Sequence, residues 1–253
     1  MSMQTRNPPE TMSISIVSHG QFNIVSQLLA DLESFRSFIH EIILTVNIPE
    51  TIEISSFENE ISVITNDYPL GFGENHNRAF FASSGEYFIV LNPDLRITTF
   101  DFTSYLDRLS SKDVGVLTPL VVNGNGKRED HIRPFPSFAG LLRRLSYRLL
   151  SDGSRSEFSP KISPPYWIGG MFMGFRSSVF RNISGFDQRY FMYLEDVDIC
   201  AELLATGYEI AIDPGNRVIH DARRGSRRNL RLFLIHCVSY VRYFRKWAGK
   251  SIG

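Results

Sequence analysis

Two groups of acidic residues have surroundings that suit chemistry, and the first is built around Asp94. This residue follows the apolar run 87–91 and the pair Asn92-Pro93, so it lies at the end of a predicted buried strand. Pro93 ends the strand and keeps the preceding residue extended, which presents the Asp94 carboxylate on a rigid turn. Mg²⁺ and Mn²⁺ take one or two such carboxylates together with substrate phosphates. Because Asn-Pro-Asp also makes ordinary turns, the segment by itself leaves a metal site and a plain turn both open.

The second group is Glu195-Asp196-Val197-Asp198, at the start of a predicted helix. Acidic residues in a first turn are favoured by the helix dipole alone, which is the purely structural explanation. However, three acids within four residues repel one another, and the apolar run just before them implies a partly buried approach that raises a carboxylate pKa. Such a carboxylate can take the proton from an attacking hydroxyl group. We predict Asp196 as this general base, with Glu195 beside it.

Further residues could contact a diphosphate ligand, and each has an alternative explanation. His220 ends a short apolar strand, where a lone histidine is more often structural than a metal ligand. The arginines around Arg224 could hold phosphate oxygens or face lipid headgroups. The turn 71–73 opens a helix as phosphate-binding turns do, but Glu74 would repel an anion, so we interpret it as a wall of the site. Gly169-Gly170 would allow close approach of a ligand or simply tight strand packing.

The elements that must position these residues alternate between strands and helices. Apolar runs predict strands at 13–17, 41–46, 61–65, 87–91, 114–122, 167–175, 209–212 and 218–219. Helical spacing and stop signals predict helices at 22–35, 75–84, 101–110, 177–182 and 195–205. This alternation predicts one Rossmann-like α/β domain with a mostly parallel central sheet flanked by helices. In such sheets ligands gather at the carboxyl ends of the strands, where Asp94 lies.

Composition and charge narrow the class of protein. Apolar residues make up 43% and charged residues 21% of the chain, which excludes a disordered or fibrous protein. With two cysteines, no apolar stretch long enough to span a bilayer and no signal-peptide pattern, we expect a cytoplasmic protein. The formal net charge is zero, yet from Ala222 onward there are seven Arg and two Lys and no acidic residue. That tail suits anionic lipid or phosphate better than nucleic acid, although a solvated helix face is equally compatible.

Two basic amphipathic helices are predicted, at 139–150 and 229–249. The apolar face of the second carries Leu230, Phe233, Leu234, Cys237, Val241, Phe244 and Ala248. The opposite face carries Arg231, Arg242, Arg245 and Lys246. A helix of this kind packs on a protein core or lies at a membrane surface.

Taken in order along the chain, six segments resemble the family 2 glycosyltransferases of the GT-A fold. Within this family, the segments most resemble the bacterial rhamnosyltransferases that build O-antigen and related polysaccharides. The segments are 16–20, 71–77, 91–94, 133–136, 167–173 and 185–198. The last, from Gly185-Phe186-Asp187 through Glu195-Asp196-Val197-Asp198, is the most diagnostic.

The resemblance implies roles for the candidate residues. Asp94 matches the last acid of the family's Asp-x-Asp motif and should hold Mg²⁺ or Mn²⁺, while Asn92 replaces the first acid. His220 matches the second protein ligand of the metal, and Asp196 matches the general base. The implied reaction is inverting transfer of L-rhamnose from dTDP-L-rhamnose to a sugar on polyprenyl diphosphate. The same fold with another donor, such as UDP-galactofuranose, or a non-catalytic member that binds nucleotide-sugar or glycan, remains as an alternative.

Donor binding is expected to involve residues from several loops. They are Ser18, His19, Asn47, Asp67, Gly73, Asn77, Asn92, Asp94, Arg133, Gly169, Gly170 and Arg224. The family usually carries an Asp-Asn pair after the second strand, whose Asp helps to read the base, whereas this chain has Val46-Asn47. Asn47, Asp67 or backbone near Ser18 could substitute, so thymidine and uridine both stay open.

The resemblance also predicts an organisation for the chain. Residues 1–12 are expected to be a disordered lead, 13–228 a GT-A catalytic domain, and 229–253 a basic amphipathic helix packed on that domain or extending it. An enzyme that modifies a lipid-linked sugar works at the membrane face, so the two basic helices predict peripheral attachment at the cytoplasmic leaflet. The oligomeric state does not follow from the sequence.

Overall fold

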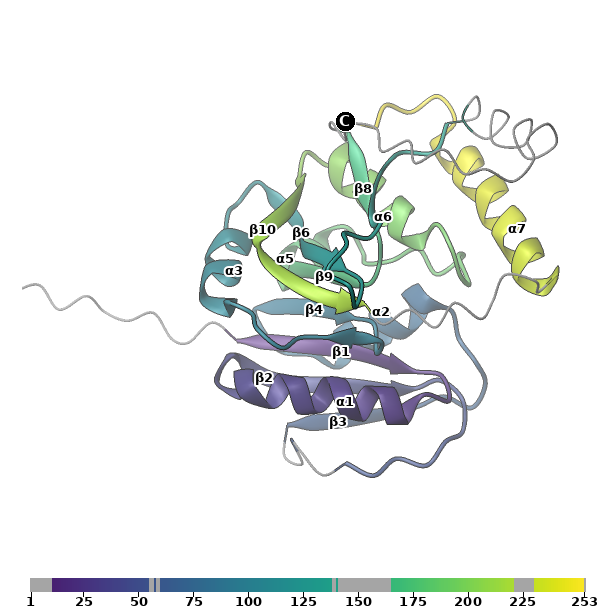
Figure 1. The fold of residues 1–253 in the computed structure, drawn as a ribbon. Coiled ribbons are helices and arrows are strands. Elements are labelled where there is room, and N and C mark those ends of the chain that lie inside the picture. The colour runs from purple at the N-terminus through teal and green to yellow at the C-terminus, as the bar shows by residue number, and fades with distance from the viewer. Residues whose placement is uncertain are drawn as a thin grey trace, which may run out of the picture.

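The computed structural model describes residues 11–54, 57, 60–137, 140, 165–220 and 230–252. It is organised around an eight-stranded sheet with the strand order β3-β2-β1-β4-β9-β6-β10-β5 (Figure 1). Most of the predicted lead, nearly all of the predicted helix 139–150 and the arginine segment that contains Arg224 lie outside the described residues.

The first half of the chain is a run of parallel βαβ units. Its elements are β1 (Met12–Ser18), α1 (Phe22–Leu32), the 3-10 helix η1 (Glu33–Phe38), β2 (Ile39–Val46), β3 (Ile61–Thr65), α2 (Phe72–Ala82) and β4 (Tyr87–Leu91). Strand β1 is parallel to both β2 and β4, and β3 is parallel to β2. All five residues of β4 are buried, because this strand is covered on both faces of the sheet.

The second half adds antiparallel pairings, by β9 and by β5 with β10, and a small separate sheet. Its elements are β5 (Leu95–Arg96), α3 (Phe102–Leu109), β6 (Val114–Val122), β7 (Ile132–Pro134), β8 (Tyr166–Ile168), β9 (Phe172–Arg176), α5 (Ser177–Asn182), α6 (Glu195–Ala205), β10 (Glu209–His220) and α7 (Leu230–Trp247). Strand β9 is antiparallel to β4 and β6, whereas β10 is parallel to β6. Strands β7 and β8 form an antiparallel pair outside the main sheet. The predicted mostly parallel sheet flanked by helices is confirmed.

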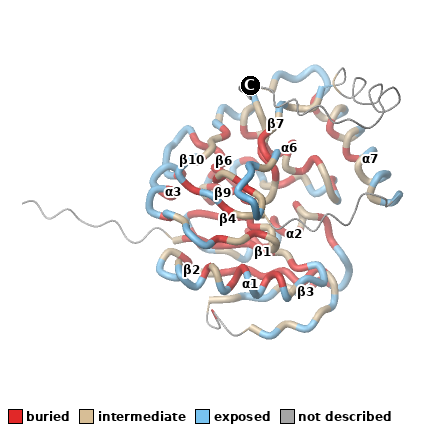
Figure 2. The backbone as a smooth tube through the Cα atoms, viewed as in Figure 1, coloured by how far each residue is buried: buried red, intermediate tan, exposed pale blue. Residues whose placement is uncertain are grey.

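Buried side chains form a layer on each face of the main sheet, and a further buried cluster lies between α6 and α7. Figure 2 shows buried backbone, in red, along the strands of the sheet. One layer joins α1 and α3 to the sheet through residues such as Leu28, Phe102 and Tyr105. The other joins α2, α5 and α6 to the sheet and contains Phe180 and Phe186, whose ring centroids are 5.6 Å apart. These layers fix the sheet, and with it the loops at the ends of its strands.

Several predicted boundaries are wrong. The strand predicted at 167–175 is two strands, β8 and β9, in different sheets, because Gly169-Gly170 turns the chain between them. The two short strands predicted at 209–212 and 218–219 are one strand, β10, with an irregular pairing between Asp213 and Arg217. The helix predicted from Asn75 begins at Phe72, so Gly73 lies inside it. A side chain does not fit at that position, because a Cβ there would be 2.5 Å from the Cβ of Phe186.

Helix α7 forms as predicted, but its predicted faces do not match its environment. Its buried residues are Ser239, Tyr243 and Trp247. Most residues of the predicted apolar face are exposed. Five large apolar residues of the helix, including Val238 beside that face, are each more than half exposed. They are Leu230, Phe233, Leu234, Val238 and Val241, which we call the outer face of α7. Lys246, predicted on the polar face, instead packs inward, with its Nζ 2.6 Å from an Asp198 carboxylate oxygen.

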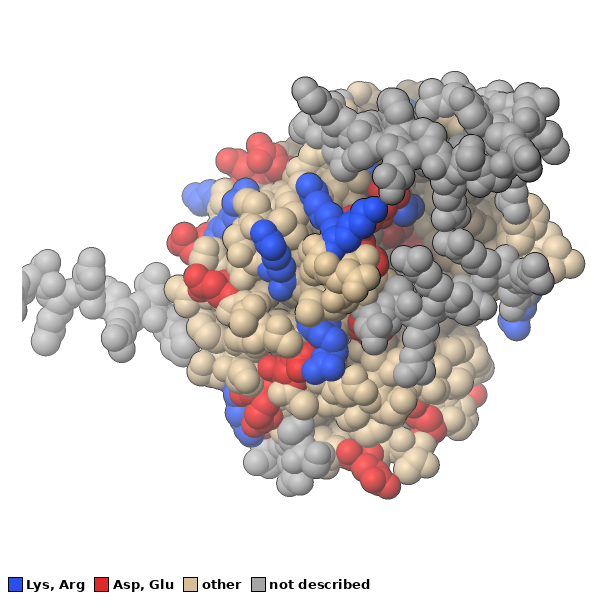
Figure 3. Space-filling view, viewed as in Figure 1, with Lys and Arg blue, Asp and Glu red and all other residues tan. Residues whose placement is uncertain are grey.

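The surface of the described residues gives no single charged patch in the view of Figure 3, where Lys and Arg are interspersed with Asp and Glu. Within the described ranges, no helix is both long enough and apolar enough to cross a membrane.

Candidate active site

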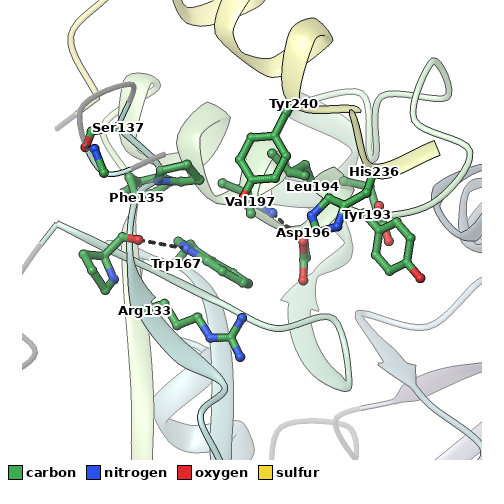
Figure 4. A pocket seen from close by; sticks show the side chains of 14 residues that line it. Arg133, Phe135, Ser137, Trp167, Tyr193, Leu194, Asp196, Val197, His236 and Tyr240 are labelled. Carbon is green, nitrogen blue, oxygen red and sulfur yellow. Dashed lines mark hydrogen bonds between the residues drawn. The ribbon is translucent and has the colours of Figure 1, made fainter. Parts of the chain in front are cut away.

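Two cavities meet at the start of α6. The smaller, of about 370 Å³, is lined by Asn92, Gly169 and Gly170. The larger, of about 600 Å³, extends toward α7 and is lined by His236 and Tyr240 (Figure 4). Both cavities share the following lining residues: Arg133, Trp167, Tyr193, Glu195 and Asp196. The predicted acid pair therefore lies at the junction of the two cavities.

The backbone just before α6 is in an unusual conformation. Tyr193 and Leu194 have φ values of 69° and 64°, in the left-handed region that L-residues avoid at a cost of about 1–2 kcal/mol each. Surrounding hydrogen bonds hold this turn, since Ser239 Oγ donates to the Met192 carbonyl at 2.9 Å and Phe72 N donates to the Phe191 carbonyl at 3.0 Å. Strained backbone of this kind is typical of functional sites.

The carboxylates of Glu195 and Asp196 have different environments. Asp196 accepts hydrogen bonds from Val197 N at 2.9 Å and Gly170 N at 3.2 Å. Glu195 is only 7% exposed, and its Oε2 has no hydrogen-bond partner within the described residues. Burial raises the pKa of both groups, and the charge of Asp196 raises that of Glu195 further. The two backbone donors favour ionised Asp196, so Glu195 is the better proton holder of the pair.

The third acid of the cluster, Asp198, faces away from the cavities. Its two oxygens accept hydrogen bonds from Lys246 Nζ at 2.6 Å, Trp247 Nε1 at 2.8 Å and Tyr190 OH at 3.2 Å. Lys246 also lies 3.3 Å from Asp187. Asp198 therefore anchors α7 to α6, and the repulsion expected among three neighbouring acids is relieved because one of them is paired with a lysine.

A second group of titratable residues forms where β5 pairs with β10. Leu95 lies opposite His220 in this antiparallel pair, which places Asp94 Oδ2 3.2 Å from His220 Nε2. The other ring nitrogen, Nδ1, is 2.7 Å from Glu129 Oε2. Burial disfavours the imidazolium, but the bonds to Asp94 and Glu129 outweigh it and raise the pKa of His220 to about 9.

One feature of the Asp94 and His220 pair suits a divalent cation, namely an unpartnered carboxylate oxygen. Asp94 Oδ1 is buried and has no hydrogen-bond partner among the described residues, so it is available as a ligand. Glu129 binds the opposite side of the imidazole, so the three side chains do not converge on one point. Accordingly, no group of three or more His, Cys, Asp or Glu residues suited to a metal ion occurs in the described part of the chain.

The other predicted donor-site residues that the structure describes fall into two sets, according to whether they line the smaller cavity. Asn92, Arg133, Gly169 and Gly170 line it. The second set, which lines neither cavity, comprises Ser18, His19, Asn47, Asp67, Gly73 and Asn77.

The asparagines of the second set support neighbouring backbone. Asn77 donates to the Phe186 carbonyl at 2.7 Å and accepts from Phe186 N at 2.9 Å. Asn47 makes the same kind of pair with Leu70, at 3.0 and 2.8 Å. His19 and Asp67 are exposed, while Ser18 is buried and accepts from Gln21 N at 3.3 Å. Any contact of these residues with a donor stays a prediction.

Among the residues around the two cavities and the Asp94 and His220 pair, several were not predicted as site residues, and four of them are important for the geometry described above. They are Glu129, Tyr193, His236 and Tyr240. Glu129 follows a turn after β6 and reaches His220 across the fold, and nothing in its local sequence marks that contact. The aromatic residues were visible only as parts of apolar or helical patterns.

The fold is that of the GT-A glycosyltransferases. Over 94% of the chain and 48% of the other protein, it superposes on the crystal structure of GalNAc-T7 with UDP, GalNAc and Mn²⁺, with a TM-score of 0.72 and 16% identity. The chain thus spans about half the length of that protein. At this identity the likeness shows the fold alone.

Sequence comparison shows that the chain is similar to bacterial rhamnosyltransferases in particular. The chain is 27% identical over 245 residues to the rhamnosyltransferase WbbL of Escherichia coli K12, covering 92% of both chains. It is 30% identical over 183 residues to the N-acetylglucosaminyl-diphospho-decaprenol L-rhamnosyltransferase of Mycobacterium tuberculosis H37Rv, covering 63% of this chain and 58% of that one. No family model matches the chain. Together with the fold, these likenesses confirm the predicted resemblance to family 2 GT-A rhamnosyltransferases and support glycosyl transfer as the activity.

Proposed function

We propose that this protein is a metal-dependent, inverting glycosyltransferase that moves L-rhamnose from dTDP-L-rhamnose to a sugar carried on polyprenyl diphosphate. The observation that carries the proposal is the position of Asp196 at the junction of two cavities. One substrate can occupy each cavity, so the base lies where donor and acceptor would meet. The likeness to two bacterial rhamnosyltransferases, one of them named for a decaprenol-linked acceptor, supports the sugar and the acceptor class.

Asp94 and His220 would hold the cation, which we propose to be Mg²⁺ or Mn²⁺. Such ions take few protein ligands and complete their coordination with substrate phosphates and water. When bound, the cation would supply charge neutralisation for the departing nucleoside diphosphate. Glu129 accepts a hydrogen bond from Nδ1 of His220, which fixes the orientation of the ring with Nε2 toward Asp94. To act as a metal ligand, Nε2 would give up its proton and its bond to Asp94.

Asp196 would act as the base. The carboxylate takes the proton from the acceptor hydroxyl as that oxygen attacks the anomeric carbon from the side opposite the diphosphate. Its hydrogen bonds with Gly170 N and Val197 N hold it in place. For a β-L-rhamnose donor, attack from the opposite side gives an α-rhamnoside. Arg133, which lines both cavities, adds positive charge close to the donor phosphates.

We further propose peripheral attachment to the cytoplasmic leaflet of the membrane through α7. The outer face of α7 is apolar and exposed, and Arg231 and Arg245 on the same helix are exposed beside it. Apolar residues with flanking basic residues suit the interface of an anionic bilayer. In this arrangement residues 13–228 would be the catalytic domain, and 229–253 would be the segment that carries α7, which packs on the domain through Tyr243 and Trp247.

The proposed donor can be tested by thermal unfolding with a panel of nucleotide-sugars. In the presence of Mn²⁺, dTDP-L-rhamnose should raise the melting temperature more than UDP-galactofuranose or UDP-N-acetylglucosamine, because a ligand of the folded state stabilises it by mass action. The shift should disappear with a chelator. Stabilisation by UDP-galactofuranose alone would replace the proposed donor, and no shift across the panel would favour a non-catalytic protein.

A further inference from the structure

One serine of α7 is bonded to the turn that precedes α6. Ser239 is 1% exposed, and its Oγ donates to the Met192 carbonyl at 2.9 Å. The preceding carbonyl, that of Phe191, accepts a hydrogen bond from Phe72 N at 3.0 Å, at the start of α2. The backbone of α2 comes so close there that a Cβ on Gly71 would be 2.6 Å from the Phe191 oxygen. Two consecutive carbonyls of the turn are therefore held by two different helices.

Side chains of α7 also pack on the next two residues of the turn. The His236 ring stacks on Tyr193, with ring centroids 4.7 Å apart and an interplanar angle of 28°. Leu194 belongs to the same buried cluster as Tyr243 of α7. Figure 4 shows His236 extending from α7 toward the segment that carries Tyr193 and Leu194. Together with the Ser239 bond, these contacts place α7 against three consecutive residues of the turn.

The turn held in this way determines how α6 begins. Tyr193 and Leu194 are the two residues with left-handed backbone, a conformation that persists in such residues only where the surrounding structure enforces it. The Leu194 carbonyl accepts a hydrogen bond from Asp198 N at 2.8 Å, as the residue that caps a helix does. The backbone of Leu194 thus sets the direction of the first turn of α6, and that turn carries Asp196.

We propose that Ser239 is a positioning residue for the general base. By holding the Met192 carbonyl, its hydroxyl keeps the left-handed turn in place and so keeps Asp196 at the junction of the two cavities. Ser239 lines neither cavity, so it acts through the backbone of the turn and not by contact with a substrate. This inference rests on the proposed function. It gives α7 a part in catalysis in addition to membrane attachment.

The first test is the kinetics of Ser239→Ala, which removes only the hydroxyl. Transfer from dTDP-L-rhamnose to N-acetylglucosaminyl diphosphate on a short alkyl chain is measured with the full chain and Mn²⁺. Because a misplaced base slows the chemical step and not binding, kcat should fall about tenfold while KM for both substrates stays within about twofold. The melting shift produced by donor and Mn²⁺ should equal that of the wild type. An unchanged kcat would overturn the inference.

The second test repeats the substitution in the Asp196→Asn background. With the base already removed, the hydroxyl of Ser239 has nothing to position, so its loss should change the residual kcat by less than about twofold. A merely structural serine would lower the rate by the same factor in both backgrounds. An equal loss in the two backgrounds would therefore overturn the positioning role, because Ser239 would then act independently of Asp196.

Ser177→Ala is the matched control for loss of stability. Ser177 is also buried, its Oγ donates to the Gly85 carbonyl at 2.6 Å at the start of α5, and it lines neither cavity. Ser177→Ala and Ser239→Ala should each lower the melting temperature by about 2–4 °C, since each loses one buried hydrogen bond. Ser177→Ala should keep kcat within about twofold of the wild type. An equal fall in kcat in both variants would overturn the inference, because lower stability would be its cause.

Amide hydrogen exchange tests the turn without any substrate. In Ser239→Ala, exchange in residues 190–197 should be at least about threefold faster than in the wild type, whereas in Ser177→Ala it should be unchanged. Unchanged exchange in Ser239→Ala would overturn the inference even if the wild-type protein transfers rhamnose. A wild-type protein with neither transfer nor a donor-induced melting shift would instead overturn the proposed function.

Discussion

The two sides of the candidate site are built differently. On the side of the first βαβ units, buried asparagines bond neighbouring backbone, as Asn77 does with Phe186 and Asn47 does with Leu70. On the α6 side, two consecutive residues have left-handed backbone and Glu195 has a buried oxygen without a partner. Satisfied buried polar groups make the first side rigid, whereas the second side keeps backbone strain and a buried carboxyl oxygen without a partner where a proton has to move.

This comparison predicts that substitutions on the two sides will fail in different ways. Changes to the asparagines should lower stability first and activity only as a consequence. Changes to the carboxylates should lower activity while the fold persists, because catalytic groups contribute little to, or even reduce, stability.

The largest expected effect is on catalysis by Asp196→Asn. The amide keeps the shape of the side chain but cannot take a proton, so the rate of transfer should fall by a factor of about 10² to 10⁴. Binding of donor and Mn²⁺, measured by calorimetry, should change little. Asp94→Asn is the contrasting variant, and it should lose metal-dependent donor binding. Equal loss of binding in both variants would contradict the roles assigned to the two acids.

The next largest effect is expected on stability, from Asn77→Ala. This change leaves both the N–H and the carbonyl of buried Phe186 without their present partner, so the free energy of unfolding should fall by about 3 kcal/mol. Urea denaturation measures it. Asn125→Ala, at an exposed turn, is the matched control and should change stability by less than about 0.5 kcal/mol. A similar small loss in Asn77→Ala would show that the asparagine side is not held by these bonds.

A smaller loss is expected from Lys246→Ala, which tests the attachment of α7. The substitution leaves Asp198, whose side chain is 2% exposed, with only Trp247 and Tyr190 as partners, so the free energy of unfolding should fall by about 2 kcal/mol. Amide hydrogen exchange should also increase first in α7. Arg245→Ala, exposed on the same turn, should leave exchange unchanged. Equal protection of α7 in both variants would mean that Lys246 does not anchor the helix.

The sequence predicted the two sides unequally well. Strands and helices of the βαβ units were found because their apolar periodicity is local, and Glu195, Asp196, Asn92 and Gly170 were placed at one site by motif. The contact of Glu129 with His220 was not predicted, since it joins residues 91 positions apart.

The prediction for helix α7 was limited in a similar way. Its helical period was readable, but apolar residues on a helix face indicate burial without saying whether protein or lipid covers them. The structure places Tyr243 and Trp247 against α6 and leaves the outer face exposed. His236 and Tyr240 became site candidates only once the packing of α7 on α6 placed them beside Asp196.

The smallest predicted effect is on pH dependence, and it tests whether Glu195 is protonated while Asp196 titrates. Burial raises the pKa of both Glu195 and Asp196. The base must be ionised, so activity should be present at high pH and lost as the pH falls through a value above the ordinary aspartate pKa of about 4. Because Glu195 is the proton holder of the pair, it is neutral while Asp196 titrates, so Glu195→Gln removes no charge and the acidic limb of kcat should move by less than about 0.3 pH unit.

Glu195→Gln should also change stability in the opposite direction to Asn77→Ala. Because the folded-state pKa of Glu195 is raised, ionising it as the pH rises destabilises the folded protein. Glu195→Gln should therefore match or exceed the wild-type stability at pH 8 and lose that advantage at pH 4, measured by urea denaturation. A kcat limb that moves to lower pH would show that Glu195 is charged while Asp196 titrates. Reduced stability at pH 8 would show that Glu195 supports the fold as Asn77 does, and the distinction between the two sides would fail at this residue.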